Sequence, residues 1–349
     1  MEKVRLGDVC ERASSNYAQK DLEELDGRYP VYGASGFIKN IDTYHQEKEY
    51  VAVVKDGAGI GRTMFLPAKS SVIGTLQYLL PKEDIEPQYL YFAVKSMHLE
   101  KYYTGATIPH IYFKDYQNEM LYLPSKEKQR EIIKIFAHLE SMINDRKEQL
   151  LLLDTLIKSR FVEMFGDLFV NENSYTECNL EELADIVSGI TKGRKTSETD
   201  LVEVPYMAVS NVKDGYIDWT TVKTIFATKA EVEQYKLMPD DILMTEGGDP
   251  DKVGRGAIIR QPLKNCIHQN HIFRVRLDRK QLVPEFFEQY LQNSKAKRYF
   301  LGCAKQTTGI ASINMGQLRK MSVLMPPLEL QEQFAAFVQA IDKSKFIMK

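Results

Sequence analysis

The sequence predicts an α+β protein built from two copies of one module, each a domain of short strands and helices followed by a long helix. Residues 123–139 (LPSKEKQREIIKIFAHL) and 325–341 (MPPLELQEQFAAFVQAI) align without a gap at an offset of 202 positions. In both segments a proline precedes a helix with the same apolar stripe. Two copies are too few for a solenoid, so we expect a pseudo-two-fold pair, and such a pair implies a target with two parts.

Two further pairs of segments repeat in the same order, although their offset shifts. VVKDGAGIGRT (53–63) corresponds to DILMTEGGDPDKVGRG (241–256), and DIEPQYLYFAVKS (84–96) corresponds to QLVPEFFEQYLQNS (281–294). The repeat therefore extends into the domain that precedes each helix.

The composition indicates a soluble, globular chain of two or three domains, because 44% of its 349 residues are hydrophobic and 27% are charged. The run of four leucines from Leu150 to Leu153 is far too short to cross a membrane, and the N-terminus has no apolar signal segment. We therefore expect a cytoplasmic protein without a membrane partner. The four cysteines are scattered without a CxxC pair, which favours reduced, buried thiols over disulfides or a zinc site.

The formal net charge of −2 counts mildly against nucleic-acid binding, because domains that bind DNA often carry a basic excess. The charge is uneven, however. Segments 252–260 and 274–280 are basic, whereas 181–185 and 231–241 are acidic. A local basic patch could still face phosphate.

The first domain is expected over residues 1–125, and a second domain over 167–327. In the first domain, glycine-rich turns alternate with short β-like runs at 50–54, 64–66, 71–73 and 77–80. One helical stretch follows near 88–102. This mixture of elements is typical of an α+β domain.

A long helix is expected over residues 126–166, between the two domains. No glycine or proline occurs from Glu127 to Phe165, and most apolar residues are spaced three or four apart. At about 1.5 Å per residue such a helix is about 58 Å long, so it must bury its apolar stripe on a partner. The second helix, expected over 328–349, is shorter, and Lys345 interrupts its stripe where Ile143 stands in the first.

The difference in helix length leaves two interpretations. Either the second copy is naturally short or frayed, or the second half of the long helix docks onto another subunit or a second copy of this chain. In the latter case the candidate partner-binding residues are Leu150, Leu153, Ile157 and Phe161.

The glycine-rich turns supply the first candidate DNA contacts. Asp56 and Arg62 replace the first glycine and the lysine of a P-loop, and no helix follows to hold a pyrophosphate, so nucleotide binding is disfavoured. A basic residue on a glycine turn, such as Arg62 or Arg255, instead suits an approach to DNA, where arginine can pair with a guanine edge. An ordinary hairpin turn is the plainer interpretation.

The segment NCIHQNHIF gives a second group of candidates. His268 and His271 have a spacing that would suit a metal on a helix, but their apolar neighbours predict a strand, where residues three apart point to opposite faces. Gln269 and Asn270 are better interpreted as amides that pair with adenine, with turn formation as the alternative. Gln77 in the first copy could play the same part.

Each copy also has a helix end that leads into a loop rich in threonine and glycine, KYYTGATIPHIY (101–112) and RYFLGCAKQTTGIASI (298–313). Hydroxyls beside a basic residue suit sugar–phosphate contacts, and tyrosine can stack or position. Half of these aromatic residues are expected to lie in the core.

No catalytic constellation is found. The sequence lacks the Asn-Pro-Pro-Tyr type of segment used in amino-methyl transfer, a helicase or ATPase loop and a nucleophile elbow. We therefore expect a non-catalytic chain with no cofactor or metal of its own, and any chemistry to belong to a partner.

Together these segments resemble the specificity (S) subunit of Type I restriction-modification systems. The likeness covers essentially the whole chain and rests on RYPVYGASGF, VVKDGAGIGR, LPSKEKQREI, LIKSRFVEMFGD, VPYMAVSNVKDGYID, GDPDKVGRG, TTGIASINMGQL and LMPPLELQEQF.

The resemblance implies that each domain is a target-recognition domain that reads one half of a bipartite sequence in double-stranded DNA. The two helices would form an antiparallel coiled coil that acts as a spacer between half-sites about 34 Å apart. The implied partners are methyltransferase (M) subunits, which would dock on the coil and methylate adenine with S-adenosylmethionine, and a motor-nuclease restriction (R) subunit that uses ATP and Mg²⁺.

By loop position, the resemblance assigns candidate DNA-contacting residues to both domains. They are Lys55, Arg62, Thr63, Gln77, Tyr103, Thr104 and Thr107 in the first domain, and Ser210, Asn211, Lys213, Lys252, Arg255, Gln269, Asn270, His271, Lys305, Thr307 and Thr308 in the second.

One departure from the family pattern is the short second helix, because family members usually close the coil with two helices of equal length. The chain is then either a truncated or recombined specificity subunit with weakened docking, or a partner completes the coil. The alternative function is a coiled-coil adaptor that binds protein and has no DNA specificity.

Overall fold

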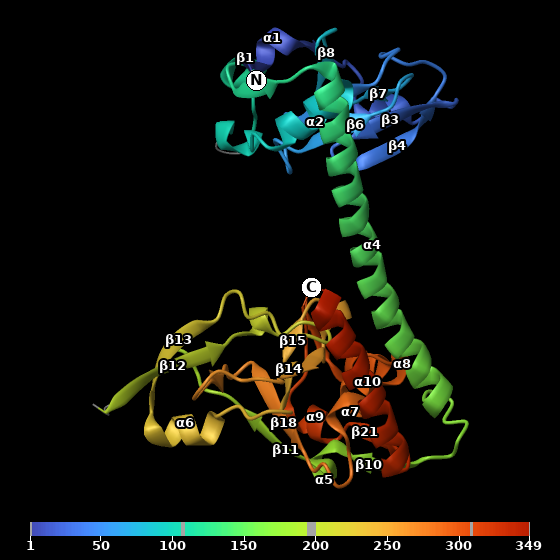
Figure 1. Ribbon diagram of the computed structural model, residues 1–349. Coiled ribbons are helices and arrows are strands. Elements are labelled where there is room, and N and C mark those ends of the chain that lie inside the picture. Colours follow the sequence, from blue (N-terminus) through green and yellow to red (C-terminus); the bar gives the residue numbers. More distant parts are fainter. Residues whose placement is uncertain (1, 106–108, 194–199, 308–309, 349) are drawn as a thin grey trace. The chain divides into compact units, whose positions relative to one another are not determined.

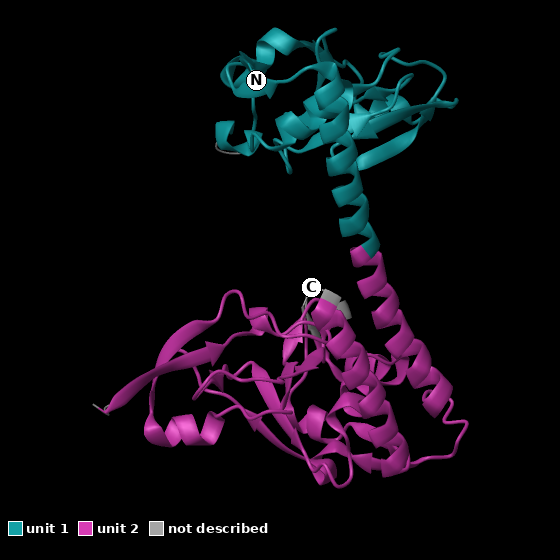
Figure 2. Cartoon of the chain, viewed as in Figure 1, with its two compact units in different colours: residues 1–145 teal, residues 146–349 magenta. Residues whose placement is uncertain are grey.

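The structure is a computed structural model that describes residues 2–105, 109–193, 200–307 and 310–348. The chain forms two compact units, residues 1–145 and 146–349 (Figure 2). The boundary falls inside one continuous helix, α4 (Lys126–Phe165), so its first half belongs to unit 1 and its second half to unit 2. The expected long helix is therefore present.

Unit 1 contains two main sheets (Figure 1). One is antiparallel with the strand order β2-β8-β5-β6, and the other has the order β4-β3-β7, in which β3 and β7 run parallel. The strands are β1 (Glu2–Arg5), β2 (Cys10–Ser14), β3 (Tyr29–Gly33), β4 (Gly36–Ile41), β5 (Tyr50–Val54), β6 (Thr63–Leu66), β7 (Ser71–Val72), β8 (Leu76–Pro81) and β9 (Met120–Leu123). The helices before α4 are α1 (Leu6–Val9), η1 (Gln19–Leu22), α2 (Pro87–Lys95), η2 (Leu99–Tyr102) and α3 (Phe113–Tyr116).

Strand β5 is central to unit 1, because all five of its residues are buried. Its side chains alternate between two cores. Val51 and Val53 pack with residues of the helices α1, α2 and α3, whereas Ala52 and Val54 pack with residues of the second sheet. The continuous apolar run YVAVV is therefore a strand covered on both faces.

The four β-like runs predicted in the first domain are strands β5 to β8. The predicted helix near 88–102 is interrupted instead of continuous. Helix α2 ends at Lys95, and His98 adopts a left-handed conformation with φ of 52° before the short 3₁₀ helix η2 begins. A left-handed residue cannot continue a right-handed helix, which explains the break.

Unit 2 repeats the strand order of both sheets and has a further three-stranded sheet (Figure 1). Its antiparallel sheet has the order β11-β18-β14-β16, and its second sheet has the order β13-β12-β17, with β12 and β17 parallel. The strands are β10 (Thr176–Asn179), β11 (Ala184–Ser188), β12 (Leu201–Met207), β13 (Lys223–Thr228), β14 (Ile242–Thr245), β15 (Gly247–Gly248), β16 (Gly256–Ile258), β17 (Ile267–His268), β18 (Ile272–Leu277), β19 (Lys305–Thr307), β20 (Ile310–Ser312) and β21 (Ser322–Met325). The helices are α5 (Leu180–Leu183), η3 (Val209–Asn211), α6 (Lys229–Tyr235), η4 (Pro250–Lys252), α7 (Pro284–Leu291), α8 (Ser294–Cys303), α9 (Met315–Arg319) and α10 (Leu328–Met348).

The internal repeat seen in the sequence is therefore a repeat of the fold. Strands β5 and β6 with their glycine turn correspond to β14 and β16, and helices α2 and α7 both begin with a proline at the first position. In each unit a short antiparallel pair, β1 with β9 or β10 with β21, leads to the start of α4 or α10.

A buried glutamine fastens each of these helices to its unit. Gln129 and Gln331 occupy the same repeat position, and both are 0% exposed. The Gln129 side chain accepts the Glu86 N–H (2.8 Å) and donates to the carbonyls of residues 84 and 124, both 2.9 Å away. Gln331 makes the equivalent bonds, accepting the Val283 N–H at 3.0 Å. The repeated glutamine thus ties the helix start to the segment before α2 or α7.

Within unit 2, helices α4 and α10 run antiparallel. Phe161 packs on Phe334 near the start of α10, with ring centroids 5.3 Å apart, and Asp154 pairs with Lys345 near its end, with Oδ1 and Nζ 2.6 Å apart. The predicted antiparallel helix pair is present. Among the described residues, no helix is both long enough and apolar enough to cross a membrane.

This pairing corrects the predicted docking residues. Ile157 and Phe161 are 8% and 2% exposed and lie in the core of unit 2, so they face the chain's own helix instead of another subunit. Leu150 and Leu153 are half-buried. The physical reason is that α10 runs antiparallel to α4, so the start of α10 covers the end of α4.

Candidate nucleic-acid interface

In unit 1, three segments meet where β5 ends. Lys55, which begins the glycine turn, donates its N–H to the Thr75 carbonyl at 2.9 Å and accepts the Ile111 N–H at 2.9 Å. Gly57 donates to the Pro109 carbonyl at 3.0 Å. The glycine turn therefore lies beside the tyrosine and threonine loop, two segments that the sequence marked separately.

Unit 2 brings the corresponding segments together with the same backbone bonds. Glu246 donates its N–H to the His271 carbonyl (3.0 Å) and accepts the Ile313 N–H (2.8 Å), while Gly248 pairs with Ala311 between β15 and β20. Glu246 thus occupies the position of Lys55 in unit 1. The offset of 202 positions also relates Ile313 to Ile111, so the gapless repeat continues upstream of residue 123.

The last glycine of each turn is required by its conformation and by close packing. Gly61 has φ of +79°, and a Cβ there would lie 2.5 Å from the Glu100 nitrogen. Gly254 has φ of +70°, and a Cβ there would lie 2.2 Å from the Phe300 ring. Both glycines let the turn press against the segment that precedes the second loop. An arginine, Arg62 or Arg255, follows each of them.

A pair of a histidine and an acid lies at each site, and neither pair is evident from the sequence. In unit 1, His110 Nδ1 is 2.6 Å from Asp56 Oδ1, and in unit 2, His271 Nδ1 is 2.5 Å from Glu246 Oε2. Continued upstream of residue 123, the gapless offset aligns HIYF (110–113) with SINM (312–315), which marks His110 in the sequence. Its contact with Asp56 depends on tertiary structure alone.

The two arginines are held differently. Arg62 is exposed, and its Nη1 donates to the Ala34 carbonyl (2.8 Å) in the turn between β3 and β4. Arg255 is half-buried, and its Nε is buried with no hydrogen-bond partner among the residues that the structure describes. A buried donor of this kind is normally satisfied in a protein, so a bound acceptor such as phosphate or a base edge would complete it. Thr63 donates its hydroxyl to the Gly61 carbonyl at 3.2 Å.

Aromatic side chains are exposed beside the unit 1 turn. Tyr103 is 61% and Tyr112 is 50% exposed, and Tyr112 stacks on His110 with ring centroids 6.3 Å apart. Lys114 lies over the Tyr112 ring, 5.4 Å from its centroid. Thr104 is exposed and bridges to His110 through the backbone. This combination of aromatic, hydroxyl and basic groups suits the backbone and sugars of a nucleic acid.

The remaining unit 2 candidates lie on η4, on η3 and the loop after it, on the segment before β18 and on the β19-β20 hairpin. Lys252, Lys305 and Ser210 are exposed, and Lys252 forms an ion pair with Asp249. Gln269 is half-buried and accepts the Val209 N–H at 3.4 Å, which joins η3 to the segment before β18. Lys213 and Asn270 are also half-buried. In the β19-β20 hairpin, Lys305 is the strand partner of Ser312, and Thr307 is the strand partner of Ile310. Thr107 and Thr308 lie outside the described residues.

Two amides among the predicted DNA-contacting residues have structural roles instead. Gln77 is 3% exposed and accepts the Tyr116 hydroxyl (3.3 Å), and Asn211 is 0% exposed and bonds to the backbone of Ala208 and Asp218, both at 2.9 Å. Neither amide can reach a base from these positions.

The predicted correspondence of Gln77 with Gln269 is also wrong. The strand registers place Gln77 opposite Val53 and Phe273 opposite Met244, so Phe273 is the equivalent of Gln77. Gln269 corresponds instead to a residue before β8. The shared glutamine in two short sequences was a coincidence that only strand register could resolve.

The segment NCIHQNHIF forms two strands with a turn between them, because β17 ends at His268, residues 270 and 271 form a turn, and β18 begins at Ile272. The alternative of turn formation therefore holds at Asn270. His268 is 0% exposed, whereas His271 is exposed, so the two side chains lie in different environments. Within the described part of the chain, no group of three or more histidine, cysteine, aspartate or glutamate residues could hold a metal ion. All four cysteines are free, and Cys10 and Cys266 are buried.

Comparison with known proteins gives one consistent family. The family described as "Type I restriction modification DNA specificity domain" matches residues 1–152 and again 172–349. The chain is 25% identical to the Type I restriction enzyme MjaVIII specificity subunit of Methanocaldococcus jannaschii, over 98% of this chain and 86% of that protein. It is 23% identical to the Type I restriction enzyme EcoKI specificity subunit of Escherichia coli K12, over 54% of this chain.

Coverage of the relatives varies. The match spans 42% of the E. coli protein and 39% of a second M. jannaschii specificity subunit. The fold is similar to the crystal structure of a Type I restriction-modification S subunit from M. genitalium, with a TM-score of 0.59 and 15% sequence identity over 99% of this chain and 90% of that chain.

Proposed function

Because this chain belongs to the Type I restriction-modification DNA specificity family, we propose that it is the non-catalytic subunit that selects the DNA target, with each unit reading one half of a bipartite sequence. The observation that carries the proposal is the repeated convergence described above. Both units place a glycine turn with an arginine against a second polar loop through equivalent backbone bonds. In both, an acid of the turn also pairs with a histidine, which belongs to the second loop in unit 1 (His110) and to the segment before β18 in unit 2 (His271). Two equivalent sites on one chain are what a two-part target requires.

The side chains at each site can make both kinds of contact that DNA recognition needs, contacts to phosphates and contacts to base edges. Exposed lysine, serine and threonine side chains at these turns would fix the protein on the phosphates, which carry no sequence information. Arg62 and Arg255 would read base edges, because a guanidinium can bond to a guanine through two parallel hydrogen bonds. Tyr103 and Tyr112 would pack on the sugar–phosphate backbone in unit 1.

The proposed partners dock on helix α4. Its middle carries large apolar side chains that remain exposed: Ile135, Phe136, Leu139, Met142 and Ile143 at 60%, 44%, 46%, 49% and 54%, and Leu151, Leu152 and Leu156 at 65%, 58% and 45%. An exposed apolar surface of this kind is typical of a protein interface. We propose that methyltransferase subunits cover it, and that this face replaces the buried Ile157 and Phe161 as the docking surface.

The chemistry in this proposal belongs to the partners. Methyltransferase subunits would hold S-adenosylmethionine and methylate adenine, and a restriction subunit would use ATP and Mg²⁺ to cleave. The specificity subunit would work beside them in the cytoplasm. Its own contribution is to set which sequence the methyltransferases engage.

The exposed face of α4 also fits the alternative of a protein-binding adaptor without DNA specificity. The deciding experiment maps methylated adenine across the genome of a host that expresses this chain with its methyltransferase partner, against the partner alone. We expect a split motif that appears only when this chain is present. If both proteins are soluble and form a complex, but no motif appears and the complex binds no DNA, the adaptor function is the correct one.

A further inference from the structure

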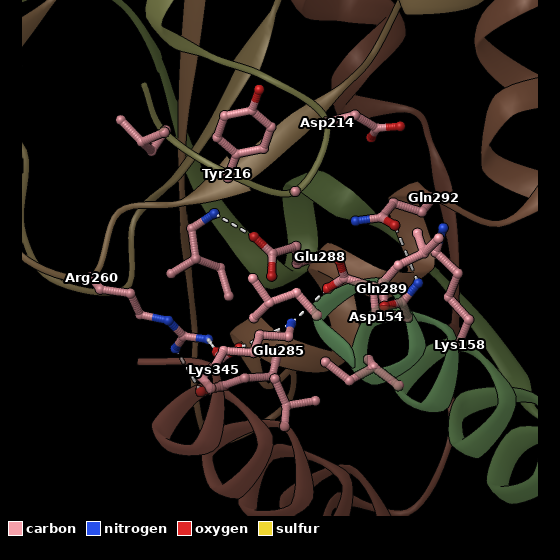
Figure 3. A pocket seen from close by; sticks show the side chains of 18 of the residues that line it. Asp154, Lys158, Asp214, Tyr216, Arg260, Glu285, Glu288, Gln289, Gln292 and Lys345 are labelled. Carbon is pink, nitrogen blue, oxygen red and sulfur yellow. Dashed lines mark hydrogen bonds and ion pairs between the residues drawn. The ribbon is translucent and has the colours of Figure 1, made fainter. Parts of the chain in front are cut away.

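Unit 2 contains a cavity of about 790 Å³ that is separate from the proposed DNA site, because none of the predicted DNA-contacting residues lines it. Figure 3 shows its walls, which come from the second half of α4, from α7, from α10 and from the loop that carries Asp214 and Tyr216. A cavity of this size can hold a small molecule or a long side chain.

The cavity offers apolar and aromatic surface to a ligand. Leu150, Ile157 and Val338 form part of the wall, and Tyr216 and Trp219 line it from the loop. Tyr216 is 61% and Trp219 is 38% exposed. Trp219 is the single tryptophan of the chain, so its fluorescence reports on this cavity.

The charged side chains around the cavity are mainly acidic. Five are acids (Asp154, Asp214, Glu285, Glu288 and Asp342) and three are bases (Lys158, Arg260 and Lys345). Two of the bases are already paired, since Arg260 Nη1 lies 2.7 Å from a Glu285 oxygen and Lys345 Nζ lies 2.6 Å from an Asp154 oxygen. The third base, Lys158, is exposed. Asp214 pairs with Lys297, and Asp342 lies near both Lys345 and Arg260. Among the described residues, Glu288 is therefore the acid of this wall that no ion pair neutralises.

Two of these acids, Glu285 and Glu288, stand one turn apart on α7. Glu285 is 2% exposed, and its Oε1 accepts from Arg260 and from the Gln339 amide (3.0 Å). Its Oε2 is buried with no hydrogen-bond partner in the part of the chain that the structure describes. Glu288 accepts the Ile258 N–H at 2.7 Å, and burial raises its pKa to about 7.

We propose that this cavity binds an alkyl-guanidinium group, with its head against Glu285 and Glu288 and its plane against the aromatic rings of Tyr216 and Trp219. A guanidinium carries a planar set of donors that match carboxylate oxygens and a face that stacks on aromatic rings. It would supply the donor that Glu285 Oε2 lacks and would add a second positive charge near Glu288, beside that of Arg260. The apolar stem would lie along Leu150 and Val338. The group comes from an arginine of another protein or from a small guanidino compound.

The test titrates the full chain, without DNA or partner, with N-acetyl-L-argininamide while Trp219 fluorescence is recorded. N-acetyl-L-citrullinamide is the neutral control, because it differs only in the head group. We expect a saturable change with a Kd of about 1 mM for the arginine probe and none for the citrulline probe. An equal response to both probes, or no saturable response, overturns the proposal.

Variants locate the binding. Glu288→Gln keeps an acceptor for the Ile258 N–H but removes the charge, and it should weaken the arginine probe at least tenfold. Tyr216→Ala changes an exposed ring without disturbing the core and should also weaken it. Glu233→Gln, on exposed α6, is the matched control and should leave the Kd unchanged. Unaltered binding in Glu288→Gln, with circular dichroism showing an intact fold, refutes the site.

Two further probes separate the sources of the group. An arginine side chain of another protein must be accepted together with its flanking backbone, so blocked Gly-Gly-Arg-Gly-Gly should bind about as well as N-propylguanidine. If the site serves a small compound, the peptide should bind at least tenfold more weakly. Failure of both probes overturns the proposal. DNA recognition is not involved in any of these measurements, so their outcome is independent of the proposed function.

Discussion

His268 is a buried histidine in strand β17. It is 0% exposed, its Nδ1 lies 3.1 Å from the Ile272 carbonyl, and burial lowers its pKa to about 4. His271, three residues later, is exposed and paired with Glu246. One histidine is therefore part of the folded core, and the other belongs to the candidate site.

The buried histidine predicts a pH dependence of stability. An unfolded histidine has a pKa near 6.5, so below that pH the unfolded state binds more protons and the free energy of unfolding falls. Stability from this group is fully present above about pH 6.5 and is lost progressively between pH 6.5 and 4, by about 3 kcal/mol in total.

Urea unfolding of unit 2, followed by Trp219 fluorescence at pH 7 and pH 5, measures this effect. His268→Gln should be less stable at pH 7, and its free energy of unfolding should differ much less between pH 7 and pH 5 than that of the unsubstituted chain. His271→Gln is the control and should keep it. An unchanged pH dependence in His268→Gln would show that another group is responsible.

The two site arginines give a prediction for specificity. Arg255→Ala should cost about 1–3 kcal/mol of binding and relax one half-site if Arg255 reads a base, but should weaken all sequences alike if it contacts phosphate. Arg62→Ala should act in the same way on the other half-site. Competition binding by the assembled complex, with DNA mutated in one half at a time, measures both, and each variant is the control for the other. No effect of either substitution would place the interface elsewhere.

At the scale of elements, the repeated glutamines make the two units separately testable. Gln331→Ala removes three buried bonds at the start of α10 and should lower the stability of unit 2 by about 2 kcal/mol. Gln129→Ala breaks the equivalent bonds in unit 1 and should leave the Trp219 transition unchanged. A shift of that transition by both variants would mean that the units unfold together.

Helix α4 has two functional parts, and one substitution in each distinguishes them. Phe161→Ala opens a cavity in the core of unit 2 and should cost about 3–5 kcal/mol of stability. Leu139→Asp lies on the exposed face, so it should leave stability nearly unchanged but weaken binding of the methyltransferase subunit. Sedimentation of the mixed subunits and thermal unfolding of the free chain measure the two effects. Full assembly by Leu139→Asp would exclude this face as the docking surface.

At the scale of the whole molecule, the net charge of −2 predicts that the isolated chain binds DNA weakly. Binding by a few basic residues at two turns depends on release of counterions, so affinity should fall steeply between about 50 and 200 mM salt. Lys305→Ala should reduce the slope of log affinity against log salt by about one. Fluorescence anisotropy with labelled duplex DNA measures both, and tight binding at high salt would contradict this prediction.

The sequence by itself determined the duplication, the α+β class and the long helix. Each of these depends on a local pattern: the apolar spacing of a helix, the run YVAVV of a buried strand, and the proline and glutamine that recur before each helix. It also marked both glycine turns and both polar loops, because glycine, threonine and arginine are grouped there in the chain.

Only the tertiary structure decided which of these groups act together. Strand register buried Gln77 while leaving His271 exposed, and hydrogen bonds between distant segments brought His110 to Asp56. The antiparallel direction of α10 determined that Phe161 is covered while Leu139 is exposed. Whether a side chain is exposed, and which side chain it contacts, depends on residues far apart in the sequence. A local sequence pattern does not encode these contacts.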